Sequence, residues 1–446
     1  MSGGSPVLKD LISELKHCFA ENWYGSFLLS SNRHVWNVGS WLKINRNFVE
    51  KGDLVSSYSH VDCAKDMPRS AISPPEIDTI KEIMCHNEEI HALVANSFIR
   101  ESESWPMRIK ECSLKNGKIV VKLDRTSVFK TILISLHSNG LKYGSQERRG
   151  EVISMSTDFI PEDSDLSQLR LALISKVLIR VLEKLGYTIS TGPASAACCL
   201  KLHLTLNPAV KLSNVSTLVC GVVRNCSGLK KEVNISADMY RRMRGRDMEQ
   251  ASVHKYGSLV HQPPWEKFIA ALSDAAVTVD LLSTKPSQPI SLDLQDKFTL
   301  SREKSSKGAT FLLYNYARLI SILRQFEEKV REGVYPPLAP IESADFSLLS
   351  SEEEWALLYC YVMPFPSLLA QLVRPDLPTF NVHVLIQFMQ DLCKCLSAYY
   401  SRVHILTEPR KHLLPLMYSR LHLISGIKIL MQSIFALFNI IPVSQM

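Results

Sequence analysis

Aromatic and basic side chains stand close together at two places in the last third of the chain. Tyr314 and Arg318 are four residues apart, so on a helix they would be neighbours on one face. Tyr400 and Arg402 form a second group of the same kind. Aromatic rings and guanidinium planes hold unstacked RNA bases, at about 1–3 kcal/mol per stacked base. The two groups are therefore candidates for contacts to a single-stranded RNA loop.

A structural role is the alternative for the tyrosines. A tyrosine at helical spacing on an apolar stripe is commonly a half-buried core residue whose hydroxyl has a partner. Tyr316 and Tyr399 fall on such stripes, so the structural and RNA-binding interpretations stay equally open for them. For Tyr400 and Arg402 we favour the interpretation that they face RNA.

The densest positive patch of the sequence lies upstream of these groups, between residues 230 and 246. Its cations are Lys230, Lys231, Arg241, Arg242, Arg244 and Arg246. Such side chains could bind phosphates through charge-assisted, bidentate bonds. A solvated surface face explains the patch equally well. A nuclear localisation signal explains it less well, because the Lys/Arg run is not continuous.

Helical periodicity organises the last third of the chain. Apolar residues recur at helical spacing over residues 309–323, 383–406 and 413–441. Pro409 marks a helix boundary between the second and third of these segments. The third is interrupted by Lys428, Gln432 and Asn439, whereas a membrane span needs about 20 predominantly apolar residues. We therefore predict an all-helical bundle over residues 306–446 and no membrane partner.

The first two thirds have mixed periodicity. Residues 7–19, 74–85 and 126–136 have the patterns of helices, and Asn116-Gly117 joins two alternating runs as a hairpin turn would. Short apolar strands at 201–206 and 217–223 are typical of an α/β sheet. The predicted fold class is α+β and α/β in the N-terminal and middle regions, followed by the all-α bundle. The predicted domains are residues 1–150, 151–305 and 306–446.

Composition narrows the function classes. The net charge of +7 is compatible with an RNA partner but does not demand one. The eleven cysteines lack zinc-site spacing, and with no secretory signal at the start they favour a reducing, cytoplasmic setting. The histidines have no partner at ligand or triad spacing, and no G-x-S-x-G motif is present. We expect no metal, no cofactor and no hydrolase chemistry.

Four stretches of the last third occur in an order that resembles the C-terminal part of arginyl-tRNA synthetases. Residues 314–323 read Tyr-Asn-Tyr-Ala-Arg-Leu-Ile-Ser-Ile-Leu, 396–403 read Leu-Ser-Ala-Tyr-Tyr-Ser-Arg-Val, 419–424 read Ser-Arg-Leu-His-Leu-Ile, and the chain ends in Ile-Pro-Val-Ser-Gln-Met. The resemblance implies a DALR anticodon-binding domain, an all-helical bundle that holds the anticodon stem and loop. It implies that Tyr314, Tyr316 and Arg318 lie near the junction with the preceding domain. Near the anticodon pocket it places Tyr400, Arg402, Arg420 and Met446.

The middle region resembles the start of a class I synthetase nucleotide fold. The helix from Leu169 to Gly186 is similar to the first helix of that fold, which follows a His-x-Gly-His turn that holds the ATP phosphates. In this chain the four turn positions are occupied by Asp165, Leu166, Ser167 and Gln168. Asp165 adds negative charge where a triphosphate would sit, Ser167 adds a Cβ where the backbone must approach it, and Gln168 cannot protonate phosphate.

No Lys-Met-Ser-type loop and no G-x-x-x-x-G-K-[ST] phosphate loop is found either. The resemblance therefore implies a degenerate synthetase without enzymatic activity. In this family, retained tRNA binding implies an adaptor that presents arginine tRNAs to a tRNA N3-methylcytidine methyltransferase acting on the anticodon loop. Two alternatives remain: an active arginine–tRNA ligase with an atypical ATP site, and a structural subunit of a protein assembly.

Overall fold

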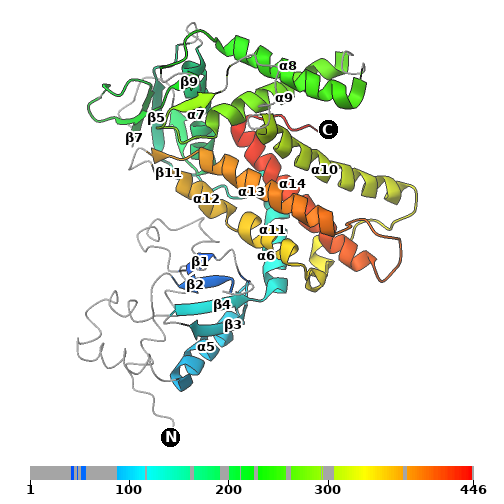
Figure 1. The fold of residues 1–446 in the computed structure, drawn as a ribbon. Coiled ribbons are helices and arrows are strands. Elements are labelled where there is room, and N and C mark those ends of the chain that lie inside the picture. Colours follow the sequence, from blue (N-terminus) through cyan, green and yellow to red (C-terminus); the bar gives the residue numbers. More distant parts are fainter. Residues whose placement is uncertain are drawn as a thin grey trace, which may run out of the picture. The chain divides into compact units, whose positions relative to one another are not determined.

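The computed structural model describes residues 42–44, 48, 52–56, 88–115, 118–160, 165–190, 200–210, 212–225, 230–257, 263–292, 294, 306–374 and 379–443. The helices predicted over 7–19 and 74–85, the Asn116-Gly117 turn itself and Met446 lie outside these residues. The chain forms two compact units, drawn in Figure 1. Unit 1 comprises Met1–Ser135 and Ile341–Pro364, and unit 2 comprises Leu136–Pro340 and Phe365–Met446. Residues 341–364, within the range predicted for the bundle, thus belong to unit 1.

Unit 1 contains an antiparallel sheet of four strands. Their order is β1-β2-β4-β3, with bounds Leu42–Ile44, Leu54–Ser56, Lys118–Leu123 and Ile109–Lys115. β3 pairs with β4 in antiparallel register up to Lys115 and Lys118, which confirms the predicted strand pair. In its described part the unit has the helices α5 (Glu88–Ser102), the start of α6 (Arg125–Asn139), η4 (Ile341–Ser343), η5 (Phe346–Leu348), α11 (Glu352–Leu357) and η6 (Leu358–Val362). α6 confirms the helix predicted over 126–136.

Asp53 joins this sheet to the 341–364 segment. One carboxylate oxygen accepts the backbone N–H of Leu123 at 2.7 Å, and the other accepts the indole N–H of Trp355 at 3.0 Å. The hydroxyl of Tyr359 donates to the Asp53 carbonyl, and its ring stacks on Trp355 with centroids 4.8 Å apart. Asp53 and Trp355 are both buried. A single carboxylate therefore ties two segments about 300 residues apart in sequence.

Unit 2 begins with a parallel sheet. Its order is β6-β5-β7-β8, with bounds Thr188–Ser190, Val152–Thr157, Leu200–Thr205 and Ser216–Val219. Between β5 and β6 runs α7 (Leu166–Lys184), which confirms the helix predicted there. α7 ends at Lys184. Gly186 follows with a φ of 87°, and the N–H groups of Gly186 and Tyr187 donate back to the last turn, which forms the left-handed cap that glycine favours.

The segment 217–223, predicted as one strand, is divided. β8 ends at Val219, and β9 (Val223–Asn225) pairs instead with β10 (Ile290–Leu292) in a separate parallel pair. Gly221 lies at the break, where a Cβ would come 2.2 Å from the backbone of Gln288. Close backbone approach at a residue without a side chain is what allows the chain to change partners there.

The helices of unit 2 pack beside each other, as Figure 1 shows for α8 and α9 and for α10, α13 and α14. Their bounds are α8 Ala237–Tyr256, α9 Pro263–Leu282, α10 Ser306–Arg331, α12 Phe365–Leu372, α13 His383–Arg402 and α14 Leu414–Phe438, and a short β11–β12 pair lies at Val373–Arg374 and Thr379–Phe380. The predicted helical bundle is confirmed. α13 ends at Arg402, four residues before the predicted end, and Asn439 in the left-handed conformation ends α14.

Two described segments, Glu352–Leu372 and Leu414–Phe438, are long and apolar enough to cross a membrane by length and composition alone. In α14, 72% of the apolar window is buried inside the protein. A helix that is apolar on all sides and covered by its neighbours is the central helix of a core. The packing of α14 therefore matches the prediction of a bundle helix.

The half-buried His137, which is hydrogen-bonded to His422, should make the stability of unit 2 depend on pH. His137 Nε2 donates to the carbonyl of His422 at 3.1 Å, and burial, with a further contribution from Lys428, lowers the pKa of His137. The unfolded chain then binds a proton near pH 6.5 that the folded chain resists. We expect the free energy of unfolding to fall as the pH drops from 6.5 to 5, and to fall less in His137→Gln. Urea denaturation across this range measures it, and equal slopes in both proteins would contradict it.

Candidate RNA-binding surface

Arg318 and Tyr400 are brought together across two helices of the bundle. The guanidinium of Arg318, on α10, lies over the ring of Tyr400, on α13, at 4.6 Å from its centroid. Arg318 is exposed, and Tyr314, one turn earlier on α10, is 44% exposed. An exposed guanidinium that lies over an aromatic ring still has a side open to a ligand. Arg318 and Tyr314 thus form a surface that could stack on a base.

The prediction that Tyr400 faces RNA is wrong, because Tyr400 is buried. Its side chain is buried beneath Arg318, and burial raises the pKa of its hydroxyl. That hydroxyl has no hydrogen-bond partner within the described part of the chain. Tyr400 therefore supports the guanidinium rather than meeting RNA directly. The physical reason is that α13 turns this residue toward α10.

Tyr316 takes the structural role that the sequence left open. It is 2% exposed, and its ring meets Phe435 of α14 edge to face with centroids 5.5 Å apart. Burial raises the pKa of its hydroxyl. Tyr399 is fully buried as well. Both tyrosines pack in the bundle core, in agreement with their positions on the apolar stripes.

Arg402 and Arg420 lie at the connection between α13 and α14. Arg402 is the last residue of α13 and is exposed, whereas Arg420 is half-buried and donates to the carbonyl of His404 at 3.4 Å. The connection, residues 403–413, also carries exposed basic side chains that the sequence analysis did not select, at His404, Arg410, Lys411 and His412. Residues 408–412 read Glu-Pro-Arg-Lys-His, so the run of basic residues that could have indicated this surface directly follows the proline that marks the helix boundary.

The basic run of 230–246 is divided by the structure. Arg244 is buried, and its guanidinium lies 2.9 Å from the Asp280 carboxylate on α9 and also bonds Asp247 and the hydroxyl of Tyr240. Burial raises the pKa of Asp280, and the charge of Arg244 opposes that rise. Arg244 therefore joins α8 to α9 and does not belong to an exposed phosphate-binding patch, because helical periodicity turns it inward.

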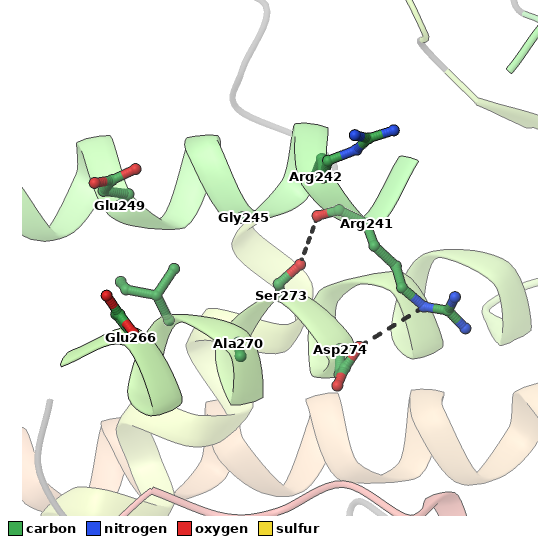
Figure 2. A pocket seen from close by; sticks show the side chains of 9 residues that line it. Arg241, Arg242, Gly245, Glu249, Glu266, Ala270, Ser273 and Asp274 are labelled. Atoms are coloured by element: carbon green, nitrogen blue, oxygen red, sulfur yellow. Dashed lines mark hydrogen bonds and ion pairs between the residues drawn. The ribbon is translucent and has the colours of Figure 1, made fainter. Parts of the chain in front are cut away.

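Arg241, Arg242 and Arg246 are exposed on α8. The first two border a groove of about 420 Å³ between α8 and α9, which Figure 2 shows from close by. Arg241 pairs with Asp238 at 3.0 Å and lies 3.9 Å from Asp274. Carboxylates also line the other end of the groove, at Glu249 and Glu266. The fold thus places acidic side chains among these cations, and the net charge of this surface is small.

The N-terminus of α7 is closed by contacts within the protein. Asp165 caps the helix by accepting the N–H of Gln168 at 2.8 Å, and it also pairs with Lys231 at 2.5 Å. Ser167 is fully buried, and its hydroxyl accepts the N–H of Val223 at 2.9 Å. The side chain of Gln168 accepts the N–H of Ile160 at 3.4 Å. A helix N-terminus attracts phosphate when its N–H groups are open, and here a carboxylate occupies that place.

Three polar residues that no sequence motif singles out lie together where β5 and β7 pair, toward the carboxyl ends of the strands. The hydroxyl of Ser156 lies 2.9 Å from His203 Nδ1, and His203 Nε2 lies 3.2 Å from the Asp158 carboxylate. Strand pairing opposite Ser156 places His203 there, 47 residues away in sequence. The contacts join the ends of the two strands. Within the described part of the chain, no group of three or more His, Cys, Asp and Glu side chains could hold a metal ion.

Residues 312–446 match the model of a family described as DALR anticodon binding domain. A protein of Danio rerio named DALR anticodon-binding domain-containing protein 3 is 34% identical over 239 residues, which are 51% of this chain and 41% of that protein. The Rattus norvegicus protein of the same name is 35% identical over 233 residues, 51% of this chain and 42% of that protein. The chain therefore matches about two fifths of the length of these relatives.

Solved structures show the same fold. An arginyl-tRNA synthetase of Thermus thermophilus superposes with a TM-score of 0.63 and 11% identity, over 97% of this chain and 100% of that chain. The enzyme of Plasmodium falciparum gives a TM-score of 0.61 and 12% identity, over 98% and 99% of the two chains. The predicted fold class and the predicted resemblance are both confirmed.

Proposed function

Because residues 312–446 form a DALR anticodon binding domain on a chain with the arginyl-tRNA synthetase fold, we propose that this protein binds tRNA through the anticodon region without charging it. The observation that carries the proposal is the exposed pair of Tyr314 and Arg318 inside that domain, with the guanidinium of Arg318 over the ring of Tyr400. Anticodon bases are unstacked in the loop, and a guanidinium plane beside an aromatic ring is suited to hold them.

The absence of charging is the second part of the proposal. It is supported by two residues at the start of α7. The carboxylate of Asp165 caps the helix and pairs with Lys231, and the hydroxyl of Ser167 accepts the N–H of Val223 in β9. A triphosphate approaching that turn would meet the Asp165 carboxylate, which already accepts the N–H of Gln168. ATP–pyrophosphate exchange with arginine and tRNA tests this, and we expect no exchange above background. Measurable exchange would favour the alternative of an arginine–tRNA ligase with an atypical ATP site.

Two finer statements complete the proposal. We propose that the tRNAs bound are the arginine isoacceptors, a choice supported by the likeness to arginine-specific synthetases. We further propose that the protein acts in the cytoplasm as an adaptor, presenting these tRNAs to a tRNA N3-methylcytidine methyltransferase. The adaptor role rests on the family resemblance alone. If the bundle instead serves as a structural subunit of an assembly, the protein should pull down proteins and no tRNA.

Crosslinking in cells tests both statements in one experiment. RNA crosslinked to the protein is sequenced, and proteins recovered in the same pull-down are identified. We expect enrichment of arginine tRNAs, with crosslinks in the anticodon loop, together with a tRNA methyltransferase. Recovery of all tRNAs in proportion to their abundance would contradict the isoacceptor statement. Recovery of no tRNA above background would contradict the proposed function.

Removing the stacking surface should weaken binding. We expect Tyr314→Ala with Arg318→Ala to lower the affinity for an arginine tRNA by about 5- to 150-fold, since one stacked base contributes about 1–3 kcal/mol. The matched control is Arg324→Ala, which removes the same charge from an exposed position on the same helix. Fluorescence anisotropy with a labelled transcript measures the affinities. An equal, small loss in both proteins would mean that charge alone is involved.

A further inference from the structure

The connection between α13 and α14 concentrates positive charge at one end of the bundle. From Arg402 to Arg420 the sequence contains four Lys or Arg residues, two histidines and a single acidic residue, Glu408. Arg410 and Glu408 form an ion pair at 2.6 Å, but both side chains are mostly exposed, and such pairs contribute little. The end of α10 carries both signs, with Lys329 and Arg331 next to Glu328 and to Glu332, which follows the helix. The excess positive charge therefore belongs to residues 402–412.

This charge is displayed on a fixed backbone. Ile405 is buried, and the hydroxyl of Tyr335 donates to the carbonyl of Thr407 at 2.5 Å. Tyr335 is itself stacked on Phe326 of α10, with centroids 5.6 Å apart. At the far end, the N–H groups of Leu413 and Leu414 donate to the Arg410 carbonyl. Side chains on a backbone held in this way lose less conformational freedom when they bind a ligand.

The connection between α13 and α14 differs from the α8 surface in how many carboxylates lie among its cations. On α8, Arg241 meets Asp238 and Asp274, and the buried Arg244 meets Asp247 and Asp280. Between α13 and α14, Glu408 is the one carboxylate that the sequence supplies. Long-range attraction of a polyanion depends on the summed charge rather than on the number of cations. The structure therefore favours the connection over α8 as the site of phosphate contacts.

We propose that residues 402–412 bind the phosphate backbone of the RNA stem adjoining the loop that Tyr314 and Arg318 contact. The inference rests on the proposed function and adds a second surface to it. Arg402 follows Tyr400 by two residues, about 3 Å of helix rise, and it is the last residue of α13. The basic connection therefore begins at the end of the helix that carries Tyr400, although the side chains of Tyr400 and Arg402 leave that helix on different faces. A backbone leaving the stacked bases would pass over the connection. Contacts of this kind fix register and add affinity, and they carry no sequence information.

The test compares Arg410→Gln with Lys411→Gln in one protein against Arg324→Gln with Lys394→Gln in another. Each pair removes two positive charges from exposed positions of the bundle. Affinities of the full chain for an arginine tRNA and for one other tRNA are measured from 0.05 to 0.3 M salt. For Arg410→Gln/Lys411→Gln we expect the salt slope to fall by about 2 and both affinities to fall about 10- to 100-fold at 0.1 M salt. The control pair should leave the salt slope nearly unchanged and should change each of the two tRNA affinities by no more than about twofold.

The outcomes separate this inference from the proposed function. If the unmodified protein binds no tRNA, both fail. If it binds and the Arg410→Gln/Lys411→Gln protein matches the control, the inference fails alone. A loss confined to the arginine tRNA would also overturn it, because phosphate contacts act on every tRNA. Unchanged RNA affinity with lost binding of a protein would assign the connection to a protein partner instead.

Discussion

Replacing Arg170 by methionine is expected to destabilise unit 2 by about 4 kcal/mol or more, because five backbone carbonyls lose their donor in a buried site. The guanidinium is fully buried, and it donates to the carbonyls of Gly221, Leu281, Thr284, Lys285 and Gln288 at 2.7 to 3.2 Å. Burial lowers its pKa to about 10, so it remains charged at neutral pH. One side chain of α7 thus holds the turn after α9 against the strand break at Gly221.

The control for this prediction is Arg180→Met, on the same helix. Arg180 is half-buried and donates to the Leu437 carbonyl and the Asn439 side chain at 3.3 and 3.2 Å, so its loss should cost about 1 kcal/mol. Urea denaturation followed by circular dichroism compares the two proteins. If Arg170→Met accumulates only in insoluble form, Arg170→Lys should be soluble and intermediate in stability, since one ammonium can satisfy part of the set. Equal stability of Arg170→Met and Arg180→Met would contradict the prediction.

Replacing Asp53 by alanine is expected to destabilise unit 1 by about 3 kcal/mol, because the buried N–H groups of Leu123 and Trp355 would both lose their acceptor. The indole of Trp355 should then become more mobile, since its hydrogen bond to Asp53 fixes it against Tyr359. Asp53→Asn should also destabilise the unit, because an amide has one oxygen and cannot accept both N–H groups without turning its NH₂ toward one of them.

Thermal unfolding followed by tryptophan fluorescence measures this effect. The matched control is Asp124→Ala, which removes the same charge from a partly buried position in unit 1. Asp124 accepts the N–H of Ser127 at 3.2 Å in the first turn of α6, so its loss should cost about 1 kcal/mol, as for other helix caps. A smaller loss in Asp53→Ala than in Asp124→Ala would show that the 341–364 segment is held by its apolar contacts and not by Asp53.

Local pattern determined much of the fold. The stripes at helical spacing predicted α10, α13 and α14, because helix periodicity depends on residues a few positions apart. The alternating runs on either side of Asn116-Gly117 correctly predicted β3 and β4 for the same reason. The resemblance to the class I synthetase fold indicated α7, which ends two residues before Gly186. The order of motifs in the last third was sufficient to indicate a DALR domain.

Exposure and net charge were decided only by the tertiary structure. The sequence predicted that Tyr400 and Arg244 are accessible to RNA, but both are buried. Arg318 of α10 lies over Tyr400, and Arg244 pairs with Asp280 of α9. The α8 cations formed the densest positive run, yet Asp274 and Glu266, distant in sequence, reduce its charge. The weaker run at 408–412 keeps a positive net charge because it contains one carboxylate, Glu408, against Arg410 and Lys411. A side chain's environment is the sum of its spatial neighbours, and most of these come from segments that periodicity cannot place.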